Sequence, residues 1–502
     1  PVLMTVDAEG RFDEEMGAFA GLAINEVHGP VIEALKAADR LFKKESIMHS
    51  VATCWRCKTR LMFKAQPAWY IDVNKLRPTM LKAAESINWH PAHFKEGRFG
   101  KGLETAPDWN ISRTRYWGSP IPVWETEDGE RVVIGSIEEL KAKAKPGTLP
   151  EKLDLHRPMI DDVIVMTESG KEAKRIVEVF DTWFDSGSMP YASVHYPFQN
   201  KKQFEDGFPA DFIGEAQDQT RGWFYSMHVL SSALFGKAAY KDVICTGLVL
   251  AEDGKKMSKS LKNYPDPWEV LQTHGADAVR YYLATSPVVE AEPLNFSERD
   301  LQTIVRGFLN LFWNIKTFYL TFAENEDVKI DKPKSAHVLD RWILSRLNQV
   351  IAETTTAMDG YDLVKGGRPL KEFVEELSTW WLRRSRDRMK SENVYERMDA
   401  LKTLLEVLLE TSKIMAPFTP FIAEKVYLEI GGKLASVHLE KWPKADERVI
   451  DSRLMLDMQW IRDAASRAHE QRSQAKIPVR QALASLTIQV KDAEEAARLM
   501  RQ

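Results

Sequence analysis

Apolar residues between positions 297 and 475 recur at intervals of three and four, so they fall on one face of an α-helix. The pattern predicts amphipathic helices separated by polar breaks, at residues 297–323, 337–357, 367–390, 396–413, 418–429 and 452–475. The charged stretch 324–335 (ENEDVKIDKPKS) lacks this pattern and is predicted to be a linker. Helices of this kind bury their apolar faces against one another, which indicates a helical bundle.

The chain before residue 290 has a different pattern, in which short apolar runs alternate with helical segments. Residues 211–214 form a short apolar run, and an amphipathic helix is expected to follow, with Asp218 as its N-cap and Gly236 at its C-terminal end. Residues 242–250 are rich in Val, Ile and Leu, which is typical of a buried parallel strand. This order predicts an α/β domain. Helical patterns also occur at residues 30–42 and 267–282.

Composition and charge narrow the class of protein. A hydrophobic fraction of 44% with 28% charged residues is typical of globular domains and argues against disorder. The formal net charge of −4 excludes a protein coated in positive charge, so a nucleic acid would have to be bound by local basic patches. Three cysteines are too few for a disulfide framework in 502 residues and fit a reducing cytosol. No apolar run approaches the ~20 residues of a membrane span, so no membrane partner is expected.

A charged loop at residues 252–262 directly follows the second predicted strand. Its centre combines two lysines and two hydroxyl groups, in the order Lys256, Met257, Ser258, Lys259 and Ser260. Such a loop can follow a phosphate chain and neutralise its developing charge, with Gly254 ahead of it for flexibility. Most lysines in loops are merely solvated, but a position between a buried strand and a helix favours a phosphate site.

Polar and aromatic residues converge near the end of the first predicted strand. Glu215 follows the apolar run, and Gln219 and Trp223 are expected on one face of the next helix because they are four residues apart. Open α/β sheets bind their ligands at the carboxyl ends of the strands. A carboxylate, an amide and an indole there suit a pocket for an amino acid or an adenylate, although most buried tryptophans belong to cores.

Several segments resemble the class I aminoacyl-tRNA synthetases, which form an aminoacyl adenylate from ATP. The loop sequence KMSKS matches a signature of that family. Three more segments are similar to its isoleucine enzymes: residues 111–124 (ISRTRYWGSPIPVW), 179–189 (VFDTWFDSGSM) and 212–225 (FIGEAQDQTRGWFY). The resemblance runs through the whole chain. It implies the second half of an α/β Rossmann-type catalytic domain, followed by an all-α anticodon-binding bundle.

The resemblance implies an enzyme that activates L-isoleucine with ATP and Mg²⁺ and transfers it to tRNA(Ile), as a cytoplasmic monomer. Lys256 and Lys259 would stabilise the departing pyrophosphate. The isoleucyl adenylate would be bound by Glu215 and Gln219, and the pocket would be shaped by Trp183 and Trp223. A valine-specific relative and a non-catalytic tRNA-binding fragment are the alternatives.

The resemblance also implies four parts of the chain. They are the tail of an editing domain at 1–53, the second half of the catalytic domain at 54–290 with a surface insertion at about 125–175, a helical connector at 291–336, and a C-terminally truncated anticodon-binding domain at 337–502. None of the 11 histidines lies in the family's His-x-Gly-His motif. We therefore expect the N-terminal portion and most of the valine-editing domain to be missing, and this chain alone to be inactive.

Two candidate metal sites are incomplete in the sequence. Cys54 and Cys57 have the spacing of half a zinc site, but no second CxxC pair exists, so zinc is a candidate cofactor only of an intact protein. Asp181 and Asp185 flank Trp183, and paired carboxylates suit Mg²⁺ or ribose hydroxyls. Aspartates in such turns more often act as caps, which is the interpretation favoured here.

Residues 377–390 (LSTWWLRRSRDRMK) place five basic side chains beside Trp380 and Trp381 on one predicted helix: Arg383, Arg384, Arg386, Arg388 and Lys390. Basic residues interleaved with aromatics suit contact with RNA. The alternative is a solvated face that braces the bundle through Glu375 and Glu376. Arg383 and Arg386, one turn apart, are the candidate tRNA-binding residues.

Overall fold

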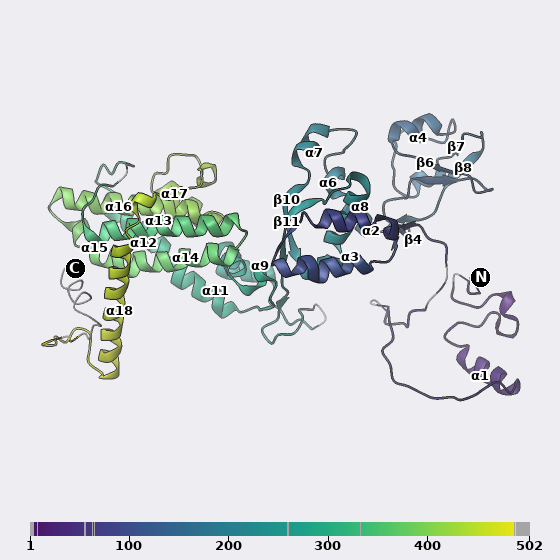
Figure 1. Ribbon diagram of the computed structural model, residues 1–502, viewed down its shortest axis with the longest axis horizontal. Coiled ribbons are helices and arrows are strands. Elements are labelled where there is room, and N and C mark those ends of the chain that lie inside the picture. Colours follow the sequence, from purple (N-terminus) through teal and green to yellow (C-terminus); the bar gives the residue numbers. More distant parts are fainter. Residues whose placement is uncertain are drawn as a thin grey trace. The chain divides into compact units, whose positions relative to one another are not determined.

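The computed structural model describes residues 5–487 except residues 8, 55–56, 63, 65, 259–260, 332 and 486. The chain forms two compact units, whose elements are labelled in Figure 1. The first unit comprises Pro1–Arg77 and Ala106–Met189, and the second comprises Pro78–Thr105 and Pro190–Gln502. In the described part of the chain, no helix is long and apolar enough to cross a membrane.

The first unit begins with little regular structure. Helix α1 spans His28–Ala37, so the helix predicted at 30–42 begins and ends earlier than expected. Two short antiparallel ladders follow, in which β1 (Tyr70–Ile71) pairs with β3 (Trp109–Asn110) and β4 (Ser112–Arg113) pairs with β9 (Val179–Phe180).

A small antiparallel sheet lies between β4 and β9. Its strand order is β6-β5-β8-β7, with bounds Arg131–Val133, Val123–Glu125, Glu172–Arg175 and Val165–Met166, and helix α4 (Ile137–Lys143) joins its core. Trp124 is buried there, and its indole N–H donates to the carbonyl of Val163 at 2.7 Å. The buried guanidinium of Arg175 pairs with Asp161, which neutralises the arginine inside this small core.

The second unit contains a three-stranded parallel sheet in the order β10-β11-β2, with bounds Ala210–Ala216, Tyr240–Thr246 and Asn88–His90. Helix α2 (Val73–Ala84) precedes β2, and helix α8 (Trp223–Phe235) connects β10 to β11, beside which it lies in Figure 1. Most of α8 is buried, and Gly236 ends it with a φ of 64°, as predicted. The parallel strands confirm the predicted α/β fold.

Two predicted elements are each divided in the structure. The strand expected at 242–250 ends at Thr246, and β12 (Val249–Leu250) pairs with β13 (Leu294–Asn295) in another sheet. The break falls at Gly247, where a Cβ atom would lie 2.0 Å from the carbonyl oxygen of Glu292. The helix expected at 267–282 is two helices, α9 (Pro267–His274) and α10 (Ala276–Ala284), because Gly275 has a φ of 83°.

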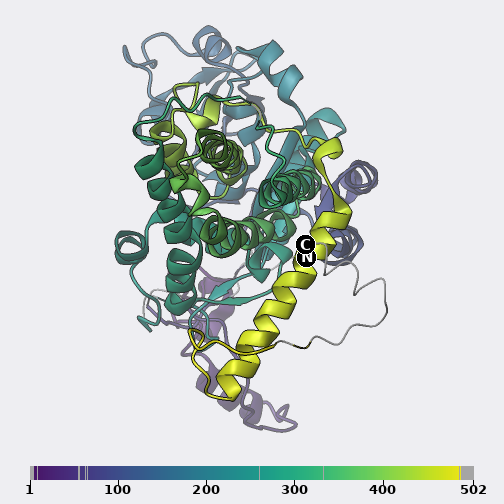
Figure 2. The same ribbon diagram turned by 90° about the vertical axis from the view of Figure 1, so that its left-hand side faces the viewer.

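The rest of the second unit is helical and confirms the predicted bundle. Figure 2 shows several of its helices end-on. They are α11 (Glu298–Ile304), α12 (Asn310–Ala323), α13 (Val338–Asp359), α14 (Leu363–Glu376), α15 (Arg383–Ser385), α16 (Val394–Met415), α17 (Pro420–Glu429) and α18 (Ser452–Gln474). The described residues of the predicted linker 324–335 form neither helix nor strand. One apolar cluster runs from Val270 to Met458 and packs the bundle helices together.

Candidate functional site

The carboxyl end of β10 presents an exposed carboxylate. Glu215 is the second-last residue of the strand and pairs in register with Cys245 of β11. The Cys245 side chain is buried, and burial raises the pKa of its thiol to about 12, so it is an inert neighbour. Glu215 is exposed, and within the described residues no hydrogen bond or ion pair engages its carboxylate. Its charge is therefore available to a ligand.

Gln219 and Trp223 meet at the turn that leads from β10 into α8. Residues Gln217–Arg221 form a 3-10 turn, and α8 begins at Trp223 after the N-cap Gly222, so the prediction of Asp218 as N-cap is wrong. The side-chain oxygen of Gln219 accepts the backbone N–H of Trp223 at 2.7 Å and caps the helix instead. Gln219 precedes α8, so the predicted shared helix face is also wrong, but this hydrogen bond brings the two residues together.

The loop after β12 is anchored through its backbone. Lys256 forms an isolated antiparallel bridge with Leu250, and the side chain of Lys256 is exposed. Asn263, which the sequence pattern did not single out, binds the backbone of both Lys256 and Ser258. Met257 and Ser258 are half-buried, whereas Lys259 and Ser260 lie outside the described residues. The turn after β10 thus lies at the carboxyl edge of the parallel sheet, where α/β sheets bind ligands. The lysine-bearing loop follows β12, which comes after β11 in the chain but pairs with β13.

Trp183, Asp181 and Asp185 belong to the first unit. Trp183 lies in α5 (Thr182–Gly187), and its side chain is 43% exposed. Asp181 occupies the N-cap position but makes no capping hydrogen bond, so the predicted turn cap is wrong. Its carboxylate accepts the Trp109 indole N–H at 3.1 Å and pairs with Arg113 at 2.9 Å. Partial desolvation raises the pKa of the Asp185 carboxyl above its ordinary value.

The cysteine pair does not fit a complete zinc site. Hydrogen bonds with Thr59 and Cys54 lower the pKa of the exposed Cys57 thiol to about 7. Zinc requires four ligands in a structural site, and Cys54 and Cys57 supply two. Throughout the described ranges, no three His, Cys, Asp or Glu side chains lie together as a metal site. Asp181 already pairs with the guanidinium of Arg113, which makes its carboxylate a poor ligand for Mg²⁺.

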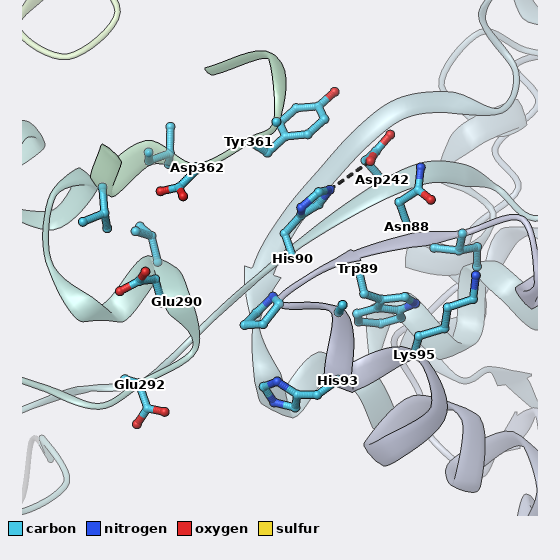
Figure 3. Close-up of a pocket in the computed structure, with 17 residues that line it drawn as sticks. Asn88, Trp89, His90, His93, Lys95, Asp242, Glu290, Glu292, Tyr361 and Asp362 are labelled. Carbon is cyan, nitrogen blue, oxygen red and sulfur yellow. Dashed lines mark hydrogen bonds and ion pairs between the residues drawn. The ribbon is translucent and has the colours of Figure 1, made fainter. Parts of the chain in front are cut away.

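A cavity of about 860 Å³ lies between the parallel sheet and the loop joining α13 to α14 (Figure 3). A hydrogen bond of 2.9 Å joins Nε2 of His90 on β2 to the carboxylate of Asp242 on β11, on the wall of the cavity. Tyr361 lies in the loop, and the centre of its ring is 5.2 Å from the ring centre of His90 and 5.6 Å from that of Phe212. None of the described residues among the predicted site residues lines this cavity. Four carboxylates line the cavity, those of Asp242, Glu290, Glu292 and Asp362, and their charge would repel a phosphate chain.

The basic segment of the bundle divides into buried and exposed members. Arg388 is buried and pairs with Asp340 through two hydrogen bonds of 2.8 and 2.6 Å. The buried Trp381 donates its indole N–H to the same carboxylate at 3.1 Å. Arg384 is exposed, and its guanidinium lies 3.2 Å from the centre of the Trp380 ring. Arg388 and Trp381 therefore belong to the core of the bundle.

Arg383 and Arg386 are exposed, and neither forms an ion pair within the part of the chain that the structure describes. The guanidinium of Arg386 lies 5.7 Å from the Phe318 ring. Glu376, one of the predicted bracing residues, pairs instead with Arg346 at 2.9 Å and with Arg462. The expected brace is thus not formed by these two arginines.

The chain combines a parallel sheet, a lysine-bearing loop after β12 and a helical bundle, and comparison with known proteins identifies its class. The family model described as tRNA synthetases class I (I, L, M and V) matches residues 14–295, more than half of the chain. A second model, the anticodon-binding domain of tRNA ligase, matches residues 340–488. The chain belongs to the class I tRNA synthetases.

Within this family, isoleucine–tRNA ligases are similar to the chain along nearly its whole length. That of Treponema denticola is 43% identical over 517 residues, which cover 99% of this chain and 46% of the relative. That of Chlamydia trachomatis serovar D is 44% identical over 493 residues, covering 97% of this chain and 47% of the relative. The chain thus spans about half the length of the curated relatives that it matches.

Solved structures share the fold at lower identity. The methionyl-tRNA synthetase of Mycobacterium tuberculosis, in complex with methionyl-adenylate, is 16% identical with a TM-score of 0.55, over 78% of this chain and 70% of that chain. The LeuRS of Agrobacterium radiobacter K84, in a ternary complex with tRNA and LeuAMS, is 22% identical with a TM-score of 0.53, over 69% of this chain and 44% of that chain.

Proposed function

We propose that this chain is part of an isoleucine–tRNA ligase, which activates L-isoleucine with ATP and transfers it to tRNA(Ile). The observation that carries the proposal is the identity of 43–44% to isoleucine–tRNA ligases along nearly the whole chain. The family model also includes valine enzymes, but the names of the relatives favour isoleucine. The intact KMSKS sequence of the loop after β12 argues against a non-catalytic role.

The amino acid and its adenylate are assigned to the turn after β10. The free carboxylate of Glu215 suits the ammonium group of isoleucine or a ribose hydroxyl, because ionised acceptors make the stronger hydrogen bonds. The oxygen of Gln219 is engaged by the N–H of Trp223, and its NH₂ group donates to Asp218 at 3.4 Å, so the second N–H of that group is the one offered to the adenylate. Trp223 is half-buried beside it and would bound the aliphatic side chain of isoleucine. The role of Trp183 in the pocket stays a prediction from the sequence.

The ATP chemistry is assigned to the loop. The isoleucine carboxylate attacks the α-phosphate, a new oxygen–phosphorus bond forms, and the bond to pyrophosphate breaks. Lys256 meets the negative charge that develops on the pyrophosphate, and we extend the same role to Lys259 from its sequence. Mg²⁺ would arrive with ATP and share this charge. No step of the proposal passes through zinc.

The anticodon arm of the tRNA is assigned to the bundle. The exposed arginines Arg383 and Arg386 carry charges that no described carboxylate neutralises, so they suit the phosphate backbone of RNA. The match of residues 340–488 to an anticodon-binding domain supports this assignment. The free cysteines fit a cytoplasmic location.

The test uses the protein expressed from its full coding sequence. Exchange of labelled pyrophosphate into ATP should depend on isoleucine, and tRNA(Ile) should be charged in preference to tRNA(Val). Faster exchange with valine would assign the protein to the valine enzymes. No exchange with isoleucine, leucine, methionine or valine would favour the non-catalytic alternative.

A further inference from the structure

Asn263 holds the backbone of the loop on both sides of Met257. Its side-chain oxygen accepts the N–H of Ser258 at 3.0 Å, and its NH₂ group donates to the carbonyl of Lys256 at 3.1 Å. The two backbone groups have opposite polarity, so the amide, with one acceptor and one donor end, matches both. The reversed amide would set donor against donor and acceptor against acceptor, which fixes its orientation.

The rest of the loop brings Asn263 back to this position. The carbonyl of Ser258 accepts the N–H groups of Leu261 and Lys262 at 3.1 and 3.0 Å, and Lys262 has a φ of 48°. On its other side, Lys256 is bridged to Leu250 of β12, which is paired with β13. The backbone of Lys256 is therefore held from the strand on one side and by Asn263 on the other.

We propose that Asn263 is a positioning residue for the reaction with ATP, a role that rests on the function proposed above. An exposed polar loop has many backbone conformations, and catalysis by charge stabilisation requires the charged group to be held before the reaction begins. Asn263 restricts residues 256–258 to one conformation and so fixes the backbone from which the Lys256 ammonium reaches the departing pyrophosphate. It acts through the loop and does not touch the reacting atoms.

Two variants distinguish the positioning role of the Asn263 side chain from a general effect on folding. Asn263→Ala removes both hydrogen bonds, whereas Asn263→Asp keeps the size and the acceptor for Ser258 but turns a second acceptor toward the Lys256 carbonyl. Asn393→Ala is the matched control, because Asn393 also binds the backbone, accepting the N–H of Tyr395 at 3.0 Å as the N-cap of α16. The variants are made in the protein expressed from its full coding sequence.

The readouts are kcat/KM for ATP and KM for isoleucine in pyrophosphate exchange, the melting temperature, and hydrogen exchange of the peptide spanning residues 255–264. Both Asn263 variants should lose about tenfold or more in kcat/KM for ATP, as expected for two hydrogen bonds, with KM for isoleucine within about twofold. Hydrogen exchange in the loop should rise in Asn263→Ala. The control should lower the melting temperature and leave the ATP kinetics unchanged.

Wild-type kcat/KM for ATP in either Asn263 variant would overturn the positioning role, as would an equal loss of isoleucine binding. If the wild-type protein shows no isoleucine-dependent exchange, the proposed function fails, and the positioning role falls with it. Hydrogen exchange still tests whether Asn263 restricts the loop in that case. Unchanged hydrogen exchange in Asn263→Ala would show that its hydrogen bonds do not hold the loop.

Discussion

The carboxylate of Asp340 on α13 and the guanidinium of Arg388 form a buried ion pair with two parallel hydrogen bonds of 2.8 and 2.6 Å. Ser335 and Trp381 donate to the same carboxylate at 2.6 and 3.1 Å. The network joins the end of the linker, α13 and the basic segment in one place. It explains why one arginine of that segment is structural while its neighbours are exposed.

Arg388→Ala should lower the free energy of unfolding by about 3–5 kcal/mol, because it leaves the Asp340 carboxylate buried without its cation. Arg386→Ala, two residues away at an exposed position, should change it by less than about 0.5 kcal/mol. Urea denaturation of both variants measures the difference. Equal stability of the two would mean that the buried pair does not hold the bundle.

Replacing Arg383 and Arg386 together by alanine should weaken tRNA binding and flatten its dependence on salt, by ~0.7–0.9 in slope for each phosphate that is no longer neutralised. The melting temperature should stay unchanged, since neither arginine has an ion pair within the described residues. The matched control replaces two exposed lysines, Lys365 of α14 and Lys425 of α17. A lower melting temperature with an unchanged salt slope would remove Arg383 and Arg386 from the RNA site.

Lys256→Ala should slow adenylate formation by ~10²–10³, the range for losing one donor that stabilises the transition state. KM for isoleucine should be unchanged, because the lysine acts on pyrophosphate. Lys255→Ala is the control, since Lys255 is exposed in the same loop and pairs with Asp253 at 2.8 Å. Pyrophosphate exchange at the wild-type rate in Lys256→Ala would refute the role of the loop.

Glu215→Gln should raise KM for isoleucine by roughly 10–100-fold, because a charged hydrogen-bond acceptor becomes a neutral one. Asp211→Asn is a control on the same strand, where Asp211 is exposed and pairs with Lys241 at 2.8 Å. Steady-state pyrophosphate exchange at varied isoleucine concentrations measures KM for both variants and so distinguishes them. The same rise in both variants would assign the effect to the charge of β10 as a whole.

His228 should make the second unit less stable in acid. Its ring lies buried in α8, where Nε2 donates to the carbonyl of Met80 at 2.8 Å, and burial lowers the pKa of His228 from 6.5 to about 4. Below pH 6.5, His228 is therefore protonated in the unfolded chain while it stays neutral in the folded protein. The contribution of His228 to the free energy of unfolding is fully present above pH 6.5. It is lost as the pH falls toward 4, by roughly 3 kcal/mol across that window.

Denaturation at pH 7 and pH 5 tests this titration. His228→Gln keeps a donor for Met80 and cannot titrate. Between the two pH values, its free energy of unfolding should therefore fall by roughly 2 kcal/mol less than that of the wild type. His469→Gln, at an exposed position of α18, should behave like the wild type. Equal losses in all three proteins would place the acid sensitivity elsewhere.

Most elements of the bundle could be predicted because helical periodicity is a local property of the chain. The pattern at 337–357 becomes α13 (Val338–Asp359), and that at 452–475 becomes α18 (Ser452–Gln474). The start of α8 could not be predicted in this way. Asp218 is a good N-cap by composition, but the chain turns once more before the helix begins, and the Gln219 side chain takes the capping role. The interruption at Gly247 was equally hidden, since it depends on the carbonyl of Glu292 from another segment.

The sequence by itself determined the family, through the loop KMSKS and the segments around Glu215, because these residues are contiguous and their order carries the resemblance. Only the tertiary structure decided which charged side chains are free to act. Arg386 and Arg388 are two residues apart in one basic segment, yet Arg386 is exposed and Arg388 is buried. The difference comes from Asp340, which reaches Arg388 from a helix 48 residues earlier in the chain. Burial of a charge depends on such long-range interactions, and no local pattern contains them.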